Sequence, residues 1–123
     1  MPTRFVLCLA AALAIAAACR ALPAQAHAVL VEATPKPGTT VAGPDLSIRL
    51  RFNTRLDHVR SSITLIAADG HAVKATMAED APPEVLAARA SGLAPGDYRL
   101  RWQVLAVDGH ITRGDVVFTV RRP

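Results

Sequence analysis

The sequence predicts an all-β domain, built either as a small sandwich of two sheets or as a Greek-key barrel. Apolar and polar side chains alternate with a period of two in three separate segments of the chain. Turns that contain glycine, proline or aspartate separate these segments. Short alternating runs bounded by such turns are typical of half-buried antiparallel strands. Strands at this spacing pack as two sheets or close into a small barrel.

The individual strands follow from this pattern. The three clearest are 46–53, 97–104 and 115–120, with inward residues expected at Leu46, Ile48, Leu50, Phe52, Tyr98, Leu100, Trp102, Val104, Val116, Phe118 and Val120. A further strand is expected at 61–67, and weaker ones at 28–33 and 83–90. Turns are expected at 36–38, 42–45, 68–70, 94–96 and 107–109. Tyr98 lies two residues after the turn expected at 94–96. This position resembles the tyrosine corner of immunoglobulin-like sandwiches, where the tyrosine hydroxyl forms a hydrogen bond with nearby backbone.

The first twenty-six residues have the pattern of a secretory signal peptide. Arg4 precedes an uninterrupted apolar run from Phe5 to Cys19, and Ala24-Gln25-Ala26 provides a small-residue cleavage site. A membrane anchor would need roughly 20 apolar residues, and this run is shorter. We therefore expect export with cleavage after Ala26, which leaves 27–123 as a single domain. Lipidation at Cys19 remains an alternative.

The composition of the expected mature chain excludes several classes of protein. Both cysteines, Cys8 and Cys19, lie in the leader, so the domain has neither a disulfide nor a thiolate ligand. The chain has fourteen Lys and Arg against ten Asp and Glu. Removing Arg4 and Arg20 leaves a net charge of +2, with the basic residues scattered. A nucleic-acid surface would need a clustered basic stripe, so no nucleic-acid partner is expected.

The segment VLAVDGHITRG, at the end of the Trp102 strand, contains a candidate metal-binding pair. Asp108 and His110 are separated by one glycine. In extended backbone, residues i and i+2 project to the same side, so a carboxylate and an imidazole can converge on one ion. Gly109 allows the backbone to bend and adjust that convergence. Alone the signal is weak, because Asp-Gly is also a common hairpin turn.

The same tripeptide occurs earlier in the chain and serves as a comparison. Asp69 and His71 lie between two expected strands, where a hairpin turn is predicted, so a structural or solvent-exposed role is the simpler interpretation. His58 is interpreted in the same way, as a histidine of a surface loop. Near spacing alone rarely makes a binding site.

Cleavage after Ala26 would make His27 the first residue of the working protein. A terminal amine and its own Nδ1 form a six-membered chelate ring around a metal. With the His110 imidazole and the Asp108 carboxylate, this gives a tetragonal set of nitrogen and oxygen donors. That set suits Cu(II), which also heads the order of divalent-metal affinities. Zinc is the competing ion, although it more often takes a tetrahedral set.

The mature chain resembles the CopC-like periplasmic copper-binding proteins over nearly its whole length. The resemblance rests on HAVLVEATPKPGTTV, IRLRFN, LAPGDYRLRWQVLAVDGH and GDVVFTV. It implies a cupredoxin-like or immunoglobulin-like β fold and one Cu(II) ion bound by the His27 amine and imidazole, Asp108 and His110. It also implies a role in copper homeostasis or resistance beside a CopD-like inner-membrane protein. No second segment of this chain could span a bilayer, so that partner would be a separate chain.

Two positions depart from the family pattern. Thr54 stands where some members have a glutamate, so we count no further acidic ligand. Met77 is the only methionine of the loop that is methionine-rich in members with a Cu(I) site, so no comparable Cu(I) site is expected. Glu32 and Asp115 are expected at the surface.

Two other functions remain open from the sequence. Copper-dependent oxidative enzymes also begin with a chelating histidine, but the 97 residues left after cleavage of this 123-residue chain offer little room for a broad substrate face. The third possibility is an immunoglobulin-like adhesion or assembly module without a metal. We expect a copper-binding protein and not an enzyme.

Overall fold

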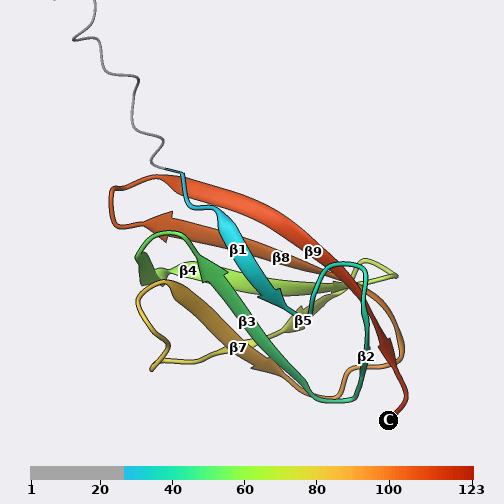
Figure 1. Cartoon of the computed structure of the whole chain (residues 1–123). Helices are drawn as coiled ribbons and strands as arrows, with labels where there is room; N and C mark the ends of the chain where they lie inside the picture. Colours follow the sequence, from blue (N-terminus) through green and yellow to red (C-terminus); the bar gives the residue numbers. More distant parts are fainter. Residues whose placement is uncertain (1–26) are drawn as a thin grey trace, which may run out of the picture.

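The computed structural model describes residues 27–123; the predicted leader and its cleavage point lie outside these residues. Two sheets pack face to face in this part of the chain (Figure 1). The strands are β1 (Leu30–Thr34), β2 (Thr40–Ala42), β3 (Leu46–Phe52), β4 (Leu56–Ala67), β5 (Ala72–Lys74), β6 (Thr76–Met77), β7 (Val85–Ala90), β8 (Gly96–Ala106) and β9 (Ile111–Arg121). No helix in the described part of the chain has the length and apolar character needed to cross a membrane. The predicted all-β sandwich is confirmed.

The sheets differ in size and in how they are paired. The smaller sheet has the order β1-β3-β7-β6 and the larger one β2-β9-β8-β4-β5. Within the larger sheet, β8 and β9 form a long antiparallel ribbon, paired from Gly96 with Val120 to Leu105 with Ile111. The short β2 extends the far end of this ribbon by pairing parallel to β9. The ribbon therefore ends in a tight turn at 107–110.

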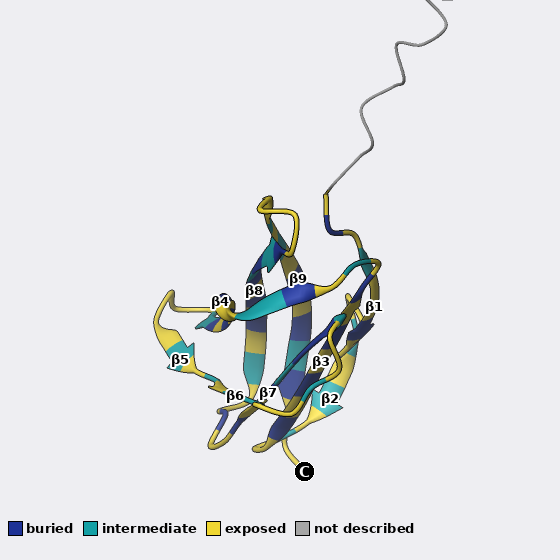
Figure 2. Ribbon diagram, turned by 90° about the vertical axis from the view of Figure 1, so that its left-hand side faces the viewer, coloured by how far each residue is buried: buried dark blue, intermediate teal, exposed yellow. Residues whose placement is uncertain are grey.

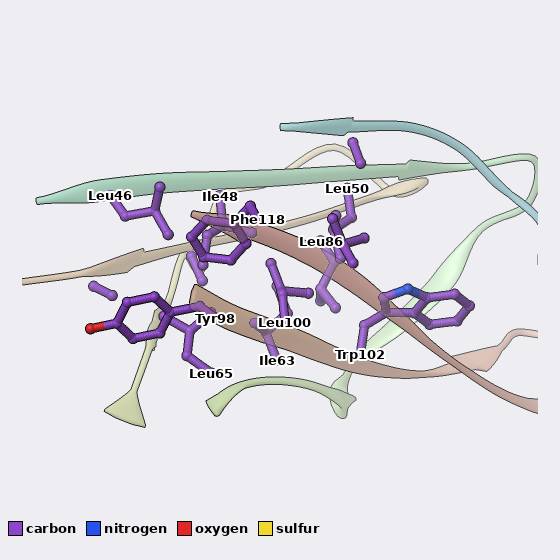
Figure 3. Close-up of a cluster of buried hydrophobic side chains, with 14 of the residues drawn as sticks. Leu46, Ile48, Leu50, Ile63, Leu65, Leu86, Tyr98, Leu100, Trp102 and Phe118 are labelled. Carbon is purple, nitrogen blue, oxygen red and sulfur yellow. The ribbon is translucent and has the colours of Figure 1, made fainter. Parts of the chain in front are cut away.

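The core contains the inward residues that the alternation predicted. All eleven predicted inward residues of the three clearest strands are buried. Figure 3 labels Leu46, Ile48, Leu50, Tyr98, Leu100, Trp102 and Phe118 among the side chains between the two sheets. Phe52 and Trp102 meet edge to face, with ring centroids 5.1 Å apart. The Tyr98 hydroxyl donates a hydrogen bond of 2.7 Å to the Ala94 carbonyl, which confirms the predicted tyrosine corner.

Several boundaries differ from the sequence prediction. The strands expected at 97–104 and 115–120 are longer, because their ladder of hydrogen bonds continues beyond the alternating residues to Ala106 and Ile111. The strand expected at 61–67 begins at Leu56 and passes through an irregularity between Asp57 and Ser62. The short edge strands β2 and β6 were not predicted, whereas β5 completes the hairpin that was expected after the strand at 61–67.

Candidate metal centre

The candidate site lies at the turn between β8 and β9, which closes over only a few residues. The Ala106 N–H donates to the His110 carbonyl at 2.9 Å, and the Gly109 N–H donates to the Ala106 carbonyl at 2.9 Å. Gly109 has a φ of 92°, a left-handed conformation that favours glycine. Asp108 and His110 are thus brought together by a tight turn and not, as the sequence suggested, by extended backbone.

Within this turn, the carboxylate and the imidazole are neighbours. The His110 backbone N–H donates to Asp108 Oδ1 at 3.1 Å. The same oxygen lies 3.3 Å from His110 Nδ1. Both side chains are exposed to solvent. The pair is therefore fixed by the backbone, while its donor atoms stay accessible to an ion from outside.

The hydrogen bonds of the turn also set the charge of the carboxyl group. The backbone N–H of His110 is the largest cause that lowers the pKa of Asp108 below its ordinary value; desolvation opposes it, and the His110 side chain adds a smaller lowering effect. A hydrogen bond to the charged form favours that form. Asp108 is therefore an anionic donor at neutral pH.

The start of β1 brings a second histidine to this turn. Val29 is held by Asn53 in both directions: its N–H donates to Asn53 Oδ1 at 2.8 Å, and its carbonyl accepts from the Asn53 N–H at 3.0 Å. Ala28 is buried. The exposed His27 ring then lies with its centroid 5.8 Å from that of His110, at an interplanar angle of 78°. Figures 1 and 2 show the start of the described chain and the β8–β9 turn at the same end of the sandwich, opposite the C-terminus.

The three predicted ligands therefore come together in pairs, through His110. His27 contacts His110 ring to ring, and His110 contacts Asp108. Among residues 27–123, no set of three or more His, Cys, Asp or Glu side chains is already arranged to hold a metal ion. The backbone nitrogen of His27 is an amide joined to Ala26 in the uncleaved chain. The predicted donor set therefore requires the free amine and a rotation of the exposed side chains.

The remaining candidates lie elsewhere or have other partners. We expected His58 in a surface loop, but it lies half-buried within β4. Its Nε2 donates a hydrogen bond of 2.7 Å to the Val85 carbonyl. Glu32 pairs with Arg51 at 3.3 Å. Asp115 contacts Arg99 and Arg101 at 3.2 and 3.3 Å.

The second Asp-Gly-His turn is remote from the site. Asp69 and His71 contact each other in the exposed β4–β5 turn. This turn lies next to Tyr98, at the opposite end of β8 from Ala106. At about 3.3 Å per strand residue, the two ends are roughly 26 Å apart. His71 therefore cannot contribute to the same ion.

One residue of the site escaped the sequence analysis. Asn53 holds the chain directly after His27, but in the sequence it is simply the last polar residue of an alternating strand. Nothing in its spacing to His27 indicates that the two are neighbours, because their contact depends on the pairing of β1 with β3.

Comparisons with known proteins agree with this fold. The family model described as "CopC domain" matches residues 30–121. Copper resistance protein C of Pseudomonas syringae pv. tomato is 32% identical over 127 aligned positions, which cover 97% of this chain and 96% of that protein. Protein YobA of Escherichia coli K12 is 29% identical over 99 positions, covering 78% of this chain and 80% of the relative.

Solved structures show the same architecture. The crystal structure of CopC from Methylosinus trichosporium OB3b matches with a TM-score of 0.70 and 35% identity, covering 78% of this chain and 95% of that one. PcoC, described as a methionine-rich copper resistance protein from Escherichia coli, matches with a TM-score of 0.69 and 28% identity, covering 78% of this chain and 100% of that one. The β sandwich is thus of the cupredoxin-like kind seen in these proteins. Because the family model spans most of the chain and a relative of this identity covers nearly all of it, the chain belongs to the CopC family.

Proposed function

We propose that this chain is an exported protein that binds one Cu(II) ion in the periplasm and sequesters it or hands it over. The ligands are the amine and imidazole of His27, the imidazole of His110 and the carboxylate of Asp108. The observation that carries the proposal is the position of the His27 ring, 5.8 Å from that of His110. Two residues 83 positions apart in sequence are adjacent at a turn that also presents a carboxylate.

The chemistry of the donor set favours Cu(II). Imidazole and amine nitrogens with one carboxylate oxygen suit a tetragonal Cu(II) site, whereas Cu(I) prefers thioether and thiolate sulfur. Met77, the methionine of the described residues, is half-buried in β6 of the smaller sheet, whereas the turn that carries Asp108 and His110 belongs to the larger sheet. Asp108 already carries its negative charge, which offsets part of the charge of the incoming ion.

The other functions considered are less well supported. The relatives whose names state a role are copper resistance proteins, which argues for binding and transfer rather than for oxidative catalysis. An adhesion module without a metal would leave the adjacency of His27 and His110 to coincidence. A CopD-like membrane protein, present as a separate chain, is the partner that this role suggests.

The decisive experiment changes only the amine. Mature protein that begins at His27 is compared with a version that carries one extra methionine ahead of it. The extra residue turns the amine into an amide and removes the chelate ring, so we expect Cu(II) affinity to fall by more than about tenfold, or 1.4 kcal/mol. Competitive Cu(II) titration measures the affinity, and electron paramagnetic resonance counts the bound nitrogens. An unchanged affinity together with an unchanged nitrogen count would exclude the amine from the site.

A further inference from the structure

The surroundings of the candidate site are unusually apolar for an exposed tip. The large hydrophobic residues that the described chain exposes are Val29, Val31, Val59, Val107, Ile111 and Val117. All except Val117 belong to the end of the sandwich that carries the site. We call Val29, Val59, Val107 and Ile111 the apolar rim.

Each member of the rim is placed by the same elements that build the site. Val29 is the residue held by Asn53, and Ile111 directly follows His110. Val107 begins the turn, and its N–H donates to the Arg55 carbonyl at 3.2 Å. Val59 lies in the irregular stretch of β4 opposite the end of β8 and is 95% exposed. Clustered exposure of this kind, next to a functional group, is typical of an interaction surface.

Two arginines without acidic partners flank the rim. Among residues 27–123 the side chain of Arg55 forms no ion pair, and Arg113 donates only to the neutral amide of Gln103, at 2.7 Å. The nearby carboxylates do not pair with these arginines: Asp57 pairs with Arg60, Glu84 is half-buried, and Asp108 contacts His110. A surface that complements this end would therefore be apolar at its centre and acidic opposite the two arginines.

We infer that the apolar rim is the docking surface for a partner protein that exchanges copper with this chain, an inference that rests on the proposed function. Copper passes between two proteins when a ligand of the acceptor reaches the ion while the donor still holds it. The acceptor must then contact the residues immediately around His27 and His110, which include Val29, Val107 and Ile111 of the rim. Their burial would exclude water from the transfer and hold the two sites in register.

The composition of the rim favours a protein over a lipid surface. Membrane-interface anchors are typically Trp and Tyr, and the Trp and Tyr of the described residues, Trp102 and Tyr98, are both buried. The rim has short β-branched side chains on strands, on the closed turn and on the segment before β1, which suit a preformed protein contact. A second copy of this chain fits poorly, because a symmetric contact buries the same patch of both copies and would bring two sets of the arginines and two bound ions into one interface.

The test expresses the full chain and its variants in a host strain whose own gene for this protein has been deleted. Copper tolerance is the first measurement. The double variant Val107→Ser and Ile111→Ser removes the centre of the rim. Val117→Ser is the matched control, because Val117 is 50% exposed on β9 but lies outside the rim. His110→Ala reports on copper binding itself. We expect survival on copper to fall to that of His110→Ala for the rim variant, and to stay at the wild-type value for Val117→Ser. The purified rim variant should keep its Cu(II) affinity.

A photo-crosslinker at Val59 identifies the occupant. Val59→p-benzoylphenylalanine should form a copper-dependent adduct with another protein in the cell, and Arg55→Glu with Arg113→Glu should abolish that adduct. Adducts with lipid or with a second copy of this chain would overturn the inference. So would full tolerance of the rim variant when His110→Ala is sensitive, an outcome that leaves the proposed function standing. Full tolerance of His110→Ala as well would instead refute the copper function and with it the docking surface.

Discussion

The two Asp-Gly-His turns of the larger sheet have nearly the same local geometry. The ring-closing bond from Ala67 N–H to the His71 carbonyl is 3.0 Å, against 2.9 Å for the corresponding bond from Ala106 to His110. The aspartate accepts from the backbone N–H of the histidine at 3.1 Å in both turns. Gly70 and Gly109 have φ angles of 90° and 92°. The tripeptide is therefore a way to close a hairpin, whatever else it does.

What differs is the third element beside each turn. At the β8–β9 turn, the start of the described chain brings the His27 ring next to His110. The β4–β5 turn instead borders a pocket lined by Ala94, Pro95, Asp97 and Tyr98, without a second histidine. The same motif becomes a candidate metal site in one place and a plain turn in the other because of a segment far away in the sequence.

Alanine at the two histidines gives the largest expected difference between the turns. His110→Ala should lower Cu(II) affinity by more than about a hundredfold, beyond the 10–100-fold usual for the loss of an outer-shell partner, since it removes a direct ligand. His71→Ala should leave it within about twofold. Competitive Cu(II) titration of the two variants, both starting at His27, measures this. Equal losses would show that the ion does not distinguish the turns.

A smaller difference is expected when only the charge is removed. Asp108→Asn keeps an oxygen that can accept the backbone hydrogen bond but deletes the anion, so Cu(II) affinity should fall about tenfold, or 1.4 kcal/mol. Asp69→Asn should have no effect on Cu(II). Thermal unfolding without metal should be nearly unchanged in both, because both side chains are exposed. A comparable loss of Cu(II) affinity in Asp69→Asn would mean that the carboxylate acts only through the overall charge.

The smallest expected difference between the two turns concerns the titration of their aspartates. In both turns the backbone N–H of the histidine is the main cause that lowers the pKa of the aspartate. A carboxyl whose pKa is lower in the folded state stabilises that state above its unfolded pKa, and this contribution is lost as the pH falls through the folded pKa. Both turns should therefore loosen only under acidic conditions.

Carbon-detected NMR of the side-chain carboxyls can follow this titration. Without copper, Asp69 and Asp108 should both titrate below a free aspartate side chain. With one equivalent of a diamagnetic divalent ion as a stand-in for copper, only Asp108 should move to a still lower midpoint, because metal and proton compete for the same oxygen. A matching shift of Asp69 would place the ion at the wrong turn.

The fold was more predictable than the site, for a physical reason. Strands β3, β8 and β9 each bury one face, so their alternation records the burial directly and the eleven inward residues could be named in advance. Strands β2, β5 and β6 have two or three residues each, too few for a pattern, and exist only because a neighbouring strand offers hydrogen bonds.

The site depends on pairing, which a single sequence does not record. The residues Asp108 and His110 could be proposed from local spacing, and His27 from the expected cleavage point and the family resemblance. Their adjacency is a consequence of tertiary structure: β1 pairs with β3, while β8 and β9 belong to the other sheet. The role of Asn53 was not predicted, because it arises only when β1 has found its place beside β3.

The two hydrogen bonds between Val29 and Asn53 have a consequence for how the proposed site would release copper. Chain termini normally fray, and a fraying terminus would have to be ordered again each time the ion binds. Here the chain is held at Val29, two residues after His27, the proposed first donor, so His27 is tethered closely to a fixed residue. Its amine and imidazole therefore stay at a high effective concentration beside His110. Such preorganisation favours binding, because little freedom is lost when the ion is bound. The amine and the imidazole of His27 can also leave the ion one after the other, while the turn that holds Asp108 and His110 stays intact.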